Sequence, residues 1–347
     1  MSVFRSISMK TYRQLSSLSV ATNKFENYAF RQTESTLSSH YQQLTRTVKP
    51  GATKDIAEHP ENSTRNRWSN VVSYDHSQFM LDEDCAGPLP RDKEPPTYIN
   101  ASWIPGENDE KEYIATQGPK KGYILDFWTM VWQTKSRTII MLTNLREPSP
   151  GDREGGKMME KCARYWPDKR RHHTTLKLTP NFKVENQGEE NLGTCGVIRS
   201  LKVTQMEEEL LVKQFHFTVW PDHGVPKNFD ECVLFLKATR EHAHKIYEQK
   251  PTEAKRNQQK YTCHEETIGF QFPLSTPRIV HCSAGAGRTG CYIVLSRVLD
   301  QLERKATQMD IKRLVGELRY NRMEMVQTSS QYKFIHDMTA FLINKMN

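Results

Sequence analysis

The sequence lacks long apolar runs and closely spaced cysteine pairs. Its apolar runs, such as residues 139–142, end within a few positions, whereas a membrane-spanning helix needs about 18 or more apolar residues. The 7 cysteines are irregularly spaced, with no C-x-x-C pair. This spacing excludes the usual zinc clusters and a disulfide-stapled secreted module. We therefore expect reduced thiols in a cytoplasmic protein without a transmembrane segment.

The chain lacks any nucleic-acid-binding motif, although its basic surplus would suit nucleic acid, acidic lipid or an anionic substrate, as well as plain solvated surface charge. It has 49 Lys and Arg against 41 Asp and Glu, a net charge of +8. Apart from short clusters such as residues 169–171, the basic residues are scattered. We expect no nucleic-acid partner. With 347 residues, 36% hydrophobic and 26% charged, the chain is long and apolar enough to bury a core.

The N-terminus differs in composition from the rest. Residues 1–24 are rich in Ser and contain basic residues but no acidic residue before Glu26. This composition is shared by organelle transit peptides and by disordered basic leaders. We favour a disordered leader, because the chemistry described below needs no organelle. The mixture of apolar and polar residues at 25–44 predicts an amphipathic helix.

Strand and helix patterns alternate through the remainder, which predicts a mixed α/β fold. Residues 137–142, 209–220 and 278–281 have the composition of strands, and the apolar spacing at 290–302 predicts a helix. Two segments resemble insertions: residues 148–159, rich in Pro and Gly, and residues 249–276, polar and without periodicity. The oligomeric state is not predicted.

The most informative segment is HCSAGAGRTG at residues 281–290. A short apolar strand leads into Cys282, small residues follow up to Arg288, and a helix begins. Small residues let the backbone curl so that its amides form an anion cradle at the helix start. The guanidinium of Arg288 can pair two phosphoryl oxygens, and the helix field stabilises a thiolate. The pattern predicts a nucleophilic cysteine beside a phosphate site.

This segment resembles the signature of the tyrosine-specific protein phosphatases. Further blocks in the family's order cover roughly residues 25–345 and include PENSTRNRW (60–68), SYDHS (73–77), TYINASWI (97–104), YIATQGP (113–119), DFWTMVW (126–132), KCARYWP (161–167), WPDHGVP (220–226) and MVQTSSQY (325–332). The resemblance implies one catalytic domain at residues 25–347 with a highly twisted mixed sheet flanked by helices. It implies phosphotyrosine-containing proteins as substrates, and neither a metal nor a cofactor.

Catalytic roles follow for several residues. Asp222 lies between Pro221 and a His223-Gly224 hinge, where a mobile loop can bring it to the leaving oxygen as general acid. The resemblance implies that Gln327 and Gln331 are the family's glutamines, the first positioning the attacking water. The hydroxyl of Thr289 is placed to donate to the sulfur of Cys282. His281 is expected to support the cysteine from behind by hydrogen bonding.

The resemblance also implies the substrate-binding residues. These are Ser283, Ala284, Gly285, Ala286, Gly287, Arg288, Asp222, Gln327, Lys161, Trp68 and Asn70. Trp68 stands where the family usually has Tyr, and either ring can stack on a phosphotyrosine. Other departures remove no catalytic group and fall at Gln78, Thr97 and Met323. The glutamate that the family carries before Lys161 is either Glu147 or Glu160.

Three alternatives compete with a tyrosine phosphatase. A phosphotyrosine-binding pseudophosphatase that sequesters its targets would usually have lost Cys282, Arg288 or Asp222, and all three are present. A dual-specificity enzyme would lack PENSTRNRW, which deepens the pocket. A sulfur-transfer or arsenate-reducing protein would lack WPDHGVP. The sequence therefore favours hydrolysis of phosphotyrosine through a phosphocysteine intermediate.

Overall fold

A large mixed sheet forms the centre of the fold. The computed structural model describes residues 18–82, 98–107, 109–148, 157–168, 174–221, 224–248 and 276–346. Within these ranges the sheet has nine strands in the order β2–β3–β4–β12–β5–β11–β10–β9–β8. In chain order they are β2 (Gln78–Met80), β3 (Tyr98–Ile104), β4 (Tyr113–Thr116), β5 (Thr138–Met141), β8 (Thr175–Thr179), β9 (Phe182–Leu192), β10 (Gly196–Gln205), β11 (Glu208–Phe217) and β12 (Arg278–His281).

The four central strands, β4, β12, β5 and β11, pair in parallel, and the outer strands pair antiparallel. Every residue of β5 and β12 is buried. Short strands that are buried along their whole length are typical of parallel strands covered on both faces. The predicted strands at 137–142, 209–220 and 278–281 are confirmed as β5, β11 and β12.

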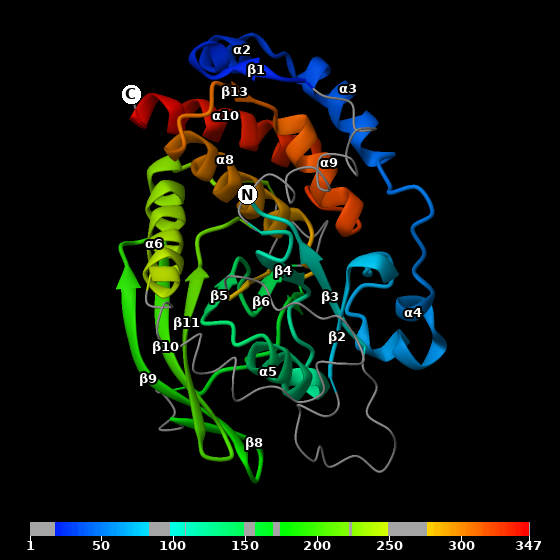
Figure 1. Ribbon diagram of the computed structural model, residues 1–347, viewed down its shortest axis with the longest axis vertical. Coiled ribbons are helices and arrows are strands. Elements are labelled where there is room, and N and C mark those ends of the chain that lie inside the picture. Colours follow the sequence, from blue (N-terminus) through cyan, green and yellow to red (C-terminus); the bar gives the residue numbers. More distant parts are fainter. Residues whose placement is uncertain are drawn as a thin grey trace.

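Helices cover both faces of the sheet (Figure 1). One face packs Ile140 and Val280 against helices α6, α8, α9 and α10, and the other packs Ile139 and Ile279 against α5. Adjacent residues of one strand belong to different hydrophobic cores, because the side chains of a strand alternate between the two faces of the sheet. The helices are α5 (Ile124–Gln133), α6 (Phe229–Glu248), α8 (Gly287–Glu303), α9 (Ile311–Asn321) and α10 (Ser329–Met346). This arrangement confirms the predicted mixed sheet flanked by helices.

Two helices replace the single helix predicted at residues 25–44. Helix α2 (Phe25–Arg31) and helix α3 (Glu34–Thr45) are separated at Gln32 and Thr33. The hydroxyl of Thr33 accepts a hydrogen bond from the amide of Thr36 at 3.1 Å. A cap of this kind satisfies a free amide and starts a new helix. Both helices pack on α10 (Figure 1).

The end of the predicted leader is ordered. Strand β1 (Val20–Ala21) pairs with β13 (Gln308–Met309), and η1 (Thr22–Lys24) connects it to α2. The amide of Leu18 donates to Asp310 Oδ2 at 3.0 Å. The prediction of disorder is therefore wrong for residues 18–24, because backbone hydrogen bonds to distant residues hold them in place. Residues 1–17 lie outside the described ranges.

The two predicted insertions fall largely outside the described residues. The flanks of the first form a hairpin of β6 (Arg146–Pro148) and β7 (Met158–Glu160), and residues 149–156 are not described. Of the second, only Thr276 is described. Short helical segments α4 (Asp55–Glu58), η2 (Pro60–Arg65), η3 (Asp75–Ser77) and η4 (Lys121–Tyr123) complete the elements.

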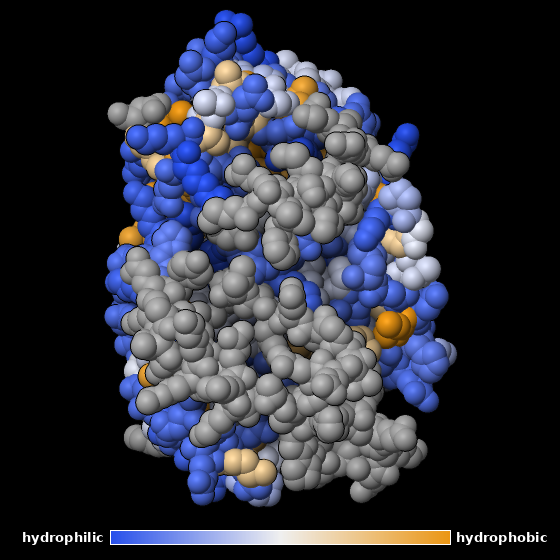
Figure 2. Space-filling view, viewed as in Figure 1, coloured by the Kyte–Doolittle hydropathy of each residue, from blue (hydrophilic) through white to orange (hydrophobic). Residues whose placement is uncertain are grey.

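The described surface on the face shown in Figure 2 is mainly hydrophilic, with scattered apolar residues. Among the described helices, none combines the length and the apolar composition that crossing a membrane requires.

Candidate active site

The cysteine loop, residues 282–287, connects the end of β12 to the first turn of α8. Cys282 is 5% exposed, and the loop turns at Gly285, whose φ is +69°. A Cβ atom at Gly285 would overlap the carbonyl oxygen of Thr116. Glycine is required here both for the left-handed backbone and for the close approach to β4. The predicted strand, tight loop and helix are thus confirmed.

Five consecutive carbonyl groups of the loop accept hydrogen bonds, most of them from other parts of the fold. The Cys282 carbonyl contacts His281 Nδ1 at 3.1 Å, and the Ser283 carbonyl accepts from the amide of Gly118 at 2.9 Å. Arg322 donates to the carbonyls of Ala284 and Gly285 at 3.0 and 2.8 Å. The Ala286 carbonyl accepts from the amides of Gly290 and Val326 at 2.7 and 3.3 Å. Because C=O and N–H point in opposite directions across a trans peptide, these bonds turn the following amides toward the other side of the loop.

Arg288, in the first turn of α8, is held by Glu147. Its Nη1 donates to Glu147 Oε1 at 2.7 Å and its Nη2 to Oε2 at 3.0 Å. Nη1 also contacts the Leu142 carbonyl at 3.1 Å. The guanidinium plane is therefore fixed by a bidentate carboxylate, the strongest common arrangement for arginine. The structure selects Glu147 over Glu160 as the partner of the site arginine.

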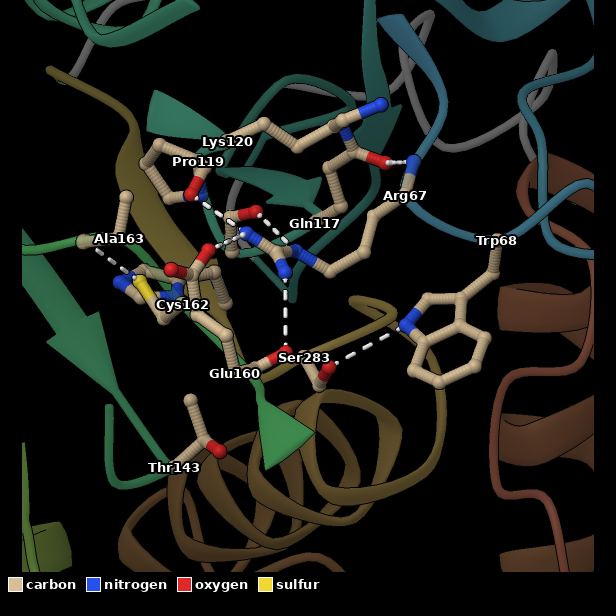
Figure 3. Close-up of polar contacts among 12 residues, drawn as sticks. Arg67, Trp68, Gln117, Pro119, Lys120, Thr143, Glu160, Cys162, Ala163 and Ser283 are labelled. Atoms are coloured by element: carbon tan, nitrogen blue, oxygen red, sulfur yellow. Dashed lines mark hydrogen bonds and ion pairs between the residues drawn. The ribbon is translucent and has the colours of Figure 1, made fainter. Parts of the chain in front are cut away.

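Glu160 instead contacts Arg67, at a distance of 3.4 Å. The guanidinium of Arg67 also donates to the carbonyls of Gly118, Pro119 and Glu160 at 2.9, 2.8 and 3.1 Å (Figure 3). Arg67 thus joins the predicted recognition loop to the residues after β4 and to the hairpin β6–β7. Lys161, which follows this hairpin, is buried, and its amide donates to the Leu145 carbonyl at 2.9 Å.

Trp68 lies directly beside the cysteine loop. Its indole Nε1 donates to Ser283 Oγ at 3.2 Å, and the ring points toward the loop (Figure 3). Its side chain is half-buried, whereas Asn70 is exposed. Trp68 thus contacts the cysteine loop, while the roles of Trp68 and Asn70 in substrate binding stay predictions.

His281 is completely buried behind the cysteine. Burial lowers the pKa of His281 to about 4, so its ring is neutral near pH 7 and has one proton. That proton is on Nδ1, because the Cys282 carbonyl can only accept. Nε2 then accepts from the hydroxyl of Tyr165 at 2.8 Å, and this hydroxyl accepts from Gln214 Nε2 at 2.6 Å. The predicted support of the cysteine loop by hydrogen bonding is confirmed.

The two glutamines lie close to the loop. A Cβ atom at Gly287 would come within 2.8 Å of Gln327 Oε1 and 2.9 Å of Gln331 Nε2. The amide of Gln327 donates to Gln331 Oε1 at 2.8 Å. Thr289 is fully buried, and within the described ranges its hydroxyl has no hydrogen-bond partner, Cys282 included.

The expected general acid, Asp222, lies outside the described residues, as do His223 and Thr97. The residues on either side of the gap are described. The carbonyl of Pro221 accepts from Arg288 Nη2 at 3.3 Å, and Trp220 Nε1 donates to the carbonyl of Gly224 at 3.3 Å. The chain therefore reaches the site arginine immediately before Asp222.

One group of potential metal ligands occurs in the described part of the chain, and it lies away from the cysteine loop. It consists of His244, Asp300 and Glu303. Arg240 forms ion pairs with both carboxylates, so a cation already occupies this position. The cysteine loop itself is lined by amides and arginine, which suit an anion.

Two residues of the site are not identified from the sequence alone. Tyr165 hydrogen-bonds His281, and Arg322 contacts the carbonyls of the loop. Tyr165 lies in the block KCARYWP, which is the signal that could have identified it. Arg322 lies between Asn321 and Met323, with Arg319 and Glu324 nearby, and no local pattern distinguishes it.

Comparisons with known proteins agree with this geometry. A family model described as protein-tyrosine phosphatase matches residues 62–341. The chain is 34% identical over 312 residues to receptor-type tyrosine-protein phosphatase zeta of Rattus norvegicus and of Homo sapiens, covering 87% of this chain and 11% of each relative. It is 36% identical over 278 residues to receptor-type tyrosine-protein phosphatase S of Gallus gallus, covering 80% and 15%. The chain thus spans a small part of the length of these relatives.

Proposed function

The chain belongs to the protein-tyrosine phosphatase family, and on that premise we propose that it hydrolyses phosphotyrosine in proteins through a phosphocysteine intermediate. One observation carries the proposal. Cys282 lies at the base of a loop whose carbonyls are bonded to the surrounding fold, beside an arginine fixed by Glu147. This arrangement presents a nucleophile together with donors for a phosphoryl group.

In the first step, the thiolate of Cys282 attacks phosphorus and the bond from phosphorus to the phenolic oxygen breaks. Asp222 donates a proton to the departing oxygen, so that tyrosine leaves as a neutral phenol. The loop amides and Arg288 stabilise the charge on the phosphoryl oxygens. The contact of the Pro221 carbonyl with Arg288 supports this role for Asp222, because it brings the adjacent chain to the arginine.

In the second step, water attacks the phosphocysteine, Asp222 accepts a proton from it, and inorganic phosphate leaves as the thiolate reforms. Gln327 positions the water, and the closeness of Gln327 and Gln331 to Gly287 at the end of the loop supports this assignment. The hydroxyl of Thr289 can turn toward the departing sulfur because no described group holds it. The two steps need neither a metal nor a cofactor.

We place phosphotyrosine selectivity in the wall formed by Trp68, with Asn70 and Lys161 at its border. The half-buried ring is tied to the cysteine loop and offers a surface on which a substrate phenyl ring stacks. We place the catalytic unit in the cytoplasm, because the mechanism requires a reduced thiol. The described cysteines, Cys282 included, are free thiols, which agrees with a reducing compartment.

A panel of matched phosphotyrosine, phosphoserine and phosphothreonine peptides, assayed with a chelator, tests this proposal. We expect phosphate release from phosphotyrosine peptides alone, undiminished by the chelator. Tight binding of phosphotyrosine peptides without turnover would instead establish a pseudophosphatase. Loss of activity in chelator would contradict the metal-independent mechanism.

A further inference from the structure

Arg322 lies behind the cysteine loop, immediately after α9, and is 0% exposed. Its three guanidinium nitrogens make five hydrogen bonds. Nε and Nη2 donate to the carbonyls of Gly285 and Ala284, and the remaining bonds reach Asn100 Oδ1 at 2.6 Å, Ser102 Oγ at 3.1 Å and Ser73 Oγ at 3.2 Å. Every acceptor is a neutral oxygen.

Within the described ranges, the other deeply buried arginines lie near a carboxylate. Arg240, Arg278 and Arg297 each form an ion pair with at least one buried carboxylate, and Arg319 lies 4.0 Å from the partly exposed carboxylate of Glu324. Arg322 has no such partner within the described ranges. Burial lowers the pKa of Arg322 to about 10, so the side chain remains charged near neutral pH. A buried charge without a counter-charge is costly to a fold, and its retention calls for a functional reason.

The guanidinium of Arg322 lies against the cysteine loop, because it donates to the carbonyls of Ala284 and Gly285, two and three residues after Cys282. A positive charge so close to a thiolate favours its ionised form. Arg288 is the other cation at the loop, but its charge is matched by Glu147. Of the two, Arg322 is the one whose positive charge no described carboxylate offsets.

The other titratable groups near Cys282 add no charge at neutral pH. The pKa of His281 is lowered by burial, so its ring is neutral. Burial raises the pKa of the thiols of Cys162 and Cys291 and of the phenol of Tyr98, so these groups stay protonated. Arg67 acts on the site from the recognition loop, where Glu160 pairs with it.

We propose that Arg322 is a positioning residue that prepares Cys282 for attack from behind the loop. It holds the carbonyls of Ala284 and Gly285 so that the next two amides face the phosphoryl group, and its uncompensated charge stabilises the thiolate before substrate binds. The inference rests on the nucleophilic role of Cys282 proposed above. It assigns part of the reactivity of Cys282 to a residue that never touches the substrate.

Alkylation of Cys282 by iodoacetamide tests this inference without requiring turnover. The reagent is neutral and reacts with the thiolate, and peptide mapping identifies the modified cysteine. The rate is measured from pH 5 to pH 9 in the wild type, Arg322→Gln and Arg322→Lys. We expect Arg322→Gln to react about tenfold or more slowly at pH 6 and to approach the wild-type rate at high pH, because loss of a nearby opposite charge disfavours the ionised form. Arg322→Lys keeps the charge and should retain most of the reactivity at pH 6.

A second pair of variants leaves Arg322 in place. Asn100→Asp puts a carboxylate against Nη2, while Asn100→Ala loses the same amide donors to Asn66 and Val71 without adding charge. The aspartate variant should react more slowly at pH 6 than the alanine variant. If the variants of one pair fail to fold, the other pair still tests the role of Arg322. Arg297→Gln, which removes a buried arginine that does not contact the loop, should leave the pH profile of Cys282 unchanged.

The outcomes separate the two proposals. Wild-type Cys282 that reacts no faster at pH 6 than an ordinary thiol would overturn the proposed nucleophile. A reactive wild type with unchanged profiles in folded Arg322→Gln or Asn100→Asp would overturn the role of Arg322 alone. Equal losses in Arg322→Lys and Arg322→Gln would show that orientation, and not charge, is responsible, and would contradict the inference as stated.

Discussion

The indole Nε1 of Trp68 donates a hydrogen bond to the hydroxyl of Ser283, the residue that follows Cys282, at 3.2 Å. This bond joins the recognition loop directly to the loop that carries the nucleophile. An indole N–H is a donor only, so Ser283 Oγ must accept, and its own proton is left for another acceptor. The ring of Trp68 is therefore held at a fixed position beside the site, where it can select for a flat substrate side chain.

Replacing Trp68 should weaken selectivity for phosphotyrosine. We expect Trp68→Ala to raise KM for phosphotyrosine peptides roughly 3- to 10-fold, the worth of one aromatic contact, and to narrow their advantage over phosphoserine peptides. Trp68→Tyr should behave nearly as wild type. Values of kcat/KM on matched peptides, together with a melting curve, measure the effect. If Trp68→Ala lowers the melting temperature but leaves the ratio of kcat/KM between phosphotyrosine and phosphoserine peptides unchanged, Trp68 contributes only to packing.

Glu147 should matter to catalysis although it is not expected to touch the substrate. In Glu147→Gln, Arg288 loses a bidentate ionic partner, and a displacement of about 1 Å can cost on the order of 10² in rate. We expect kcat/KM to fall about 10- to 100-fold and phosphate to inhibit more weakly. The matched control is Glu160→Gln, whose long ion pair with Arg67 is half exposed on the glutamate side and is worth about 1 kcal/mol at most. Equal losses in both variants would contradict the special role of Glu147.

Asp222→Ala should lower kcat far more than it changes KM, because the proton is needed mainly in the transition state. The expected loss is about 10²–10⁴-fold, and it should shrink for aryl phosphates with very acidic phenols. Asp230→Ala, which removes an exposed acid at the start of α6, serves as a control with nearly wild-type rates. If Asp222→Ala loses the same factor on every leaving group, Asp222 is not the general acid.

Acid should destabilise the fold through its buried histidines. Burial lowers the pKa of His281 to about 4 and of His216 and His336 to about 3, against about 6.5 in an unfolded chain. The neutral histidines contribute fully to the free energy of unfolding above about pH 6.5. This contribution is lost as pH falls toward 3–4, because in that range only the unfolded state binds protons. Each of the three groups changes the free energy of unfolding by about 1.4 kcal/mol per pH unit. Together they give a limiting slope of about 4 kcal/mol per pH unit near pH 5.

The contribution of His336 can be isolated. Both its ring nitrogens are buried without a hydrogen-bond partner among the described residues, and its ring stacks on Phe25. His336→Leu should therefore cost little stability at pH 7.5 and remove about a third of the slope. Chemical denaturation at several pH values between 5 and 7.5 measures both quantities. A slope that the substitution leaves unchanged would exclude His336 as a source of the acid sensitivity.

The centre of the site is predictable from the sequence because its signals are local. An apolar strand, a run of small residues and a periodic helix follow one another at residues 278–302, and the structure places them as β12, the cysteine loop and α8. The glutamate partner of Arg288 is not predictable in this way. Glu147 and Glu160 lie on paired strands, β6 and β7, and contact different arginines, so the choice depends on hairpin geometry.

Contacts between segments that are distant in the sequence also cannot be predicted, because they depend on the three-dimensional fold and not on local patterns. Arg322 reaches carbonyls 37 and 38 positions earlier in the chain, and no spacing rule connects them. Strand β1 pairs with β13 through backbone groups, which leave no side-chain pattern, so residues 18–24 resemble a leader. The break between α2 and α3 depends on the single cap of Thr33, because the apolar spacing continues across it.

Direct capture of the phosphorylated enzyme tests the central claim. The protein is mixed with a phosphotyrosine peptide, quenched in acid within the first turnover and mapped by mass spectrometry. We expect phosphate bound to Cys282 in the wild type, and a Cys282→Ser variant that binds the peptide but releases no phosphate, because a serine hydroxyl is a poor nucleophile at this site. Phosphate release by Cys282→Ser within tenfold of the wild type, or phosphate found on a different residue, would contradict the proposed mechanism.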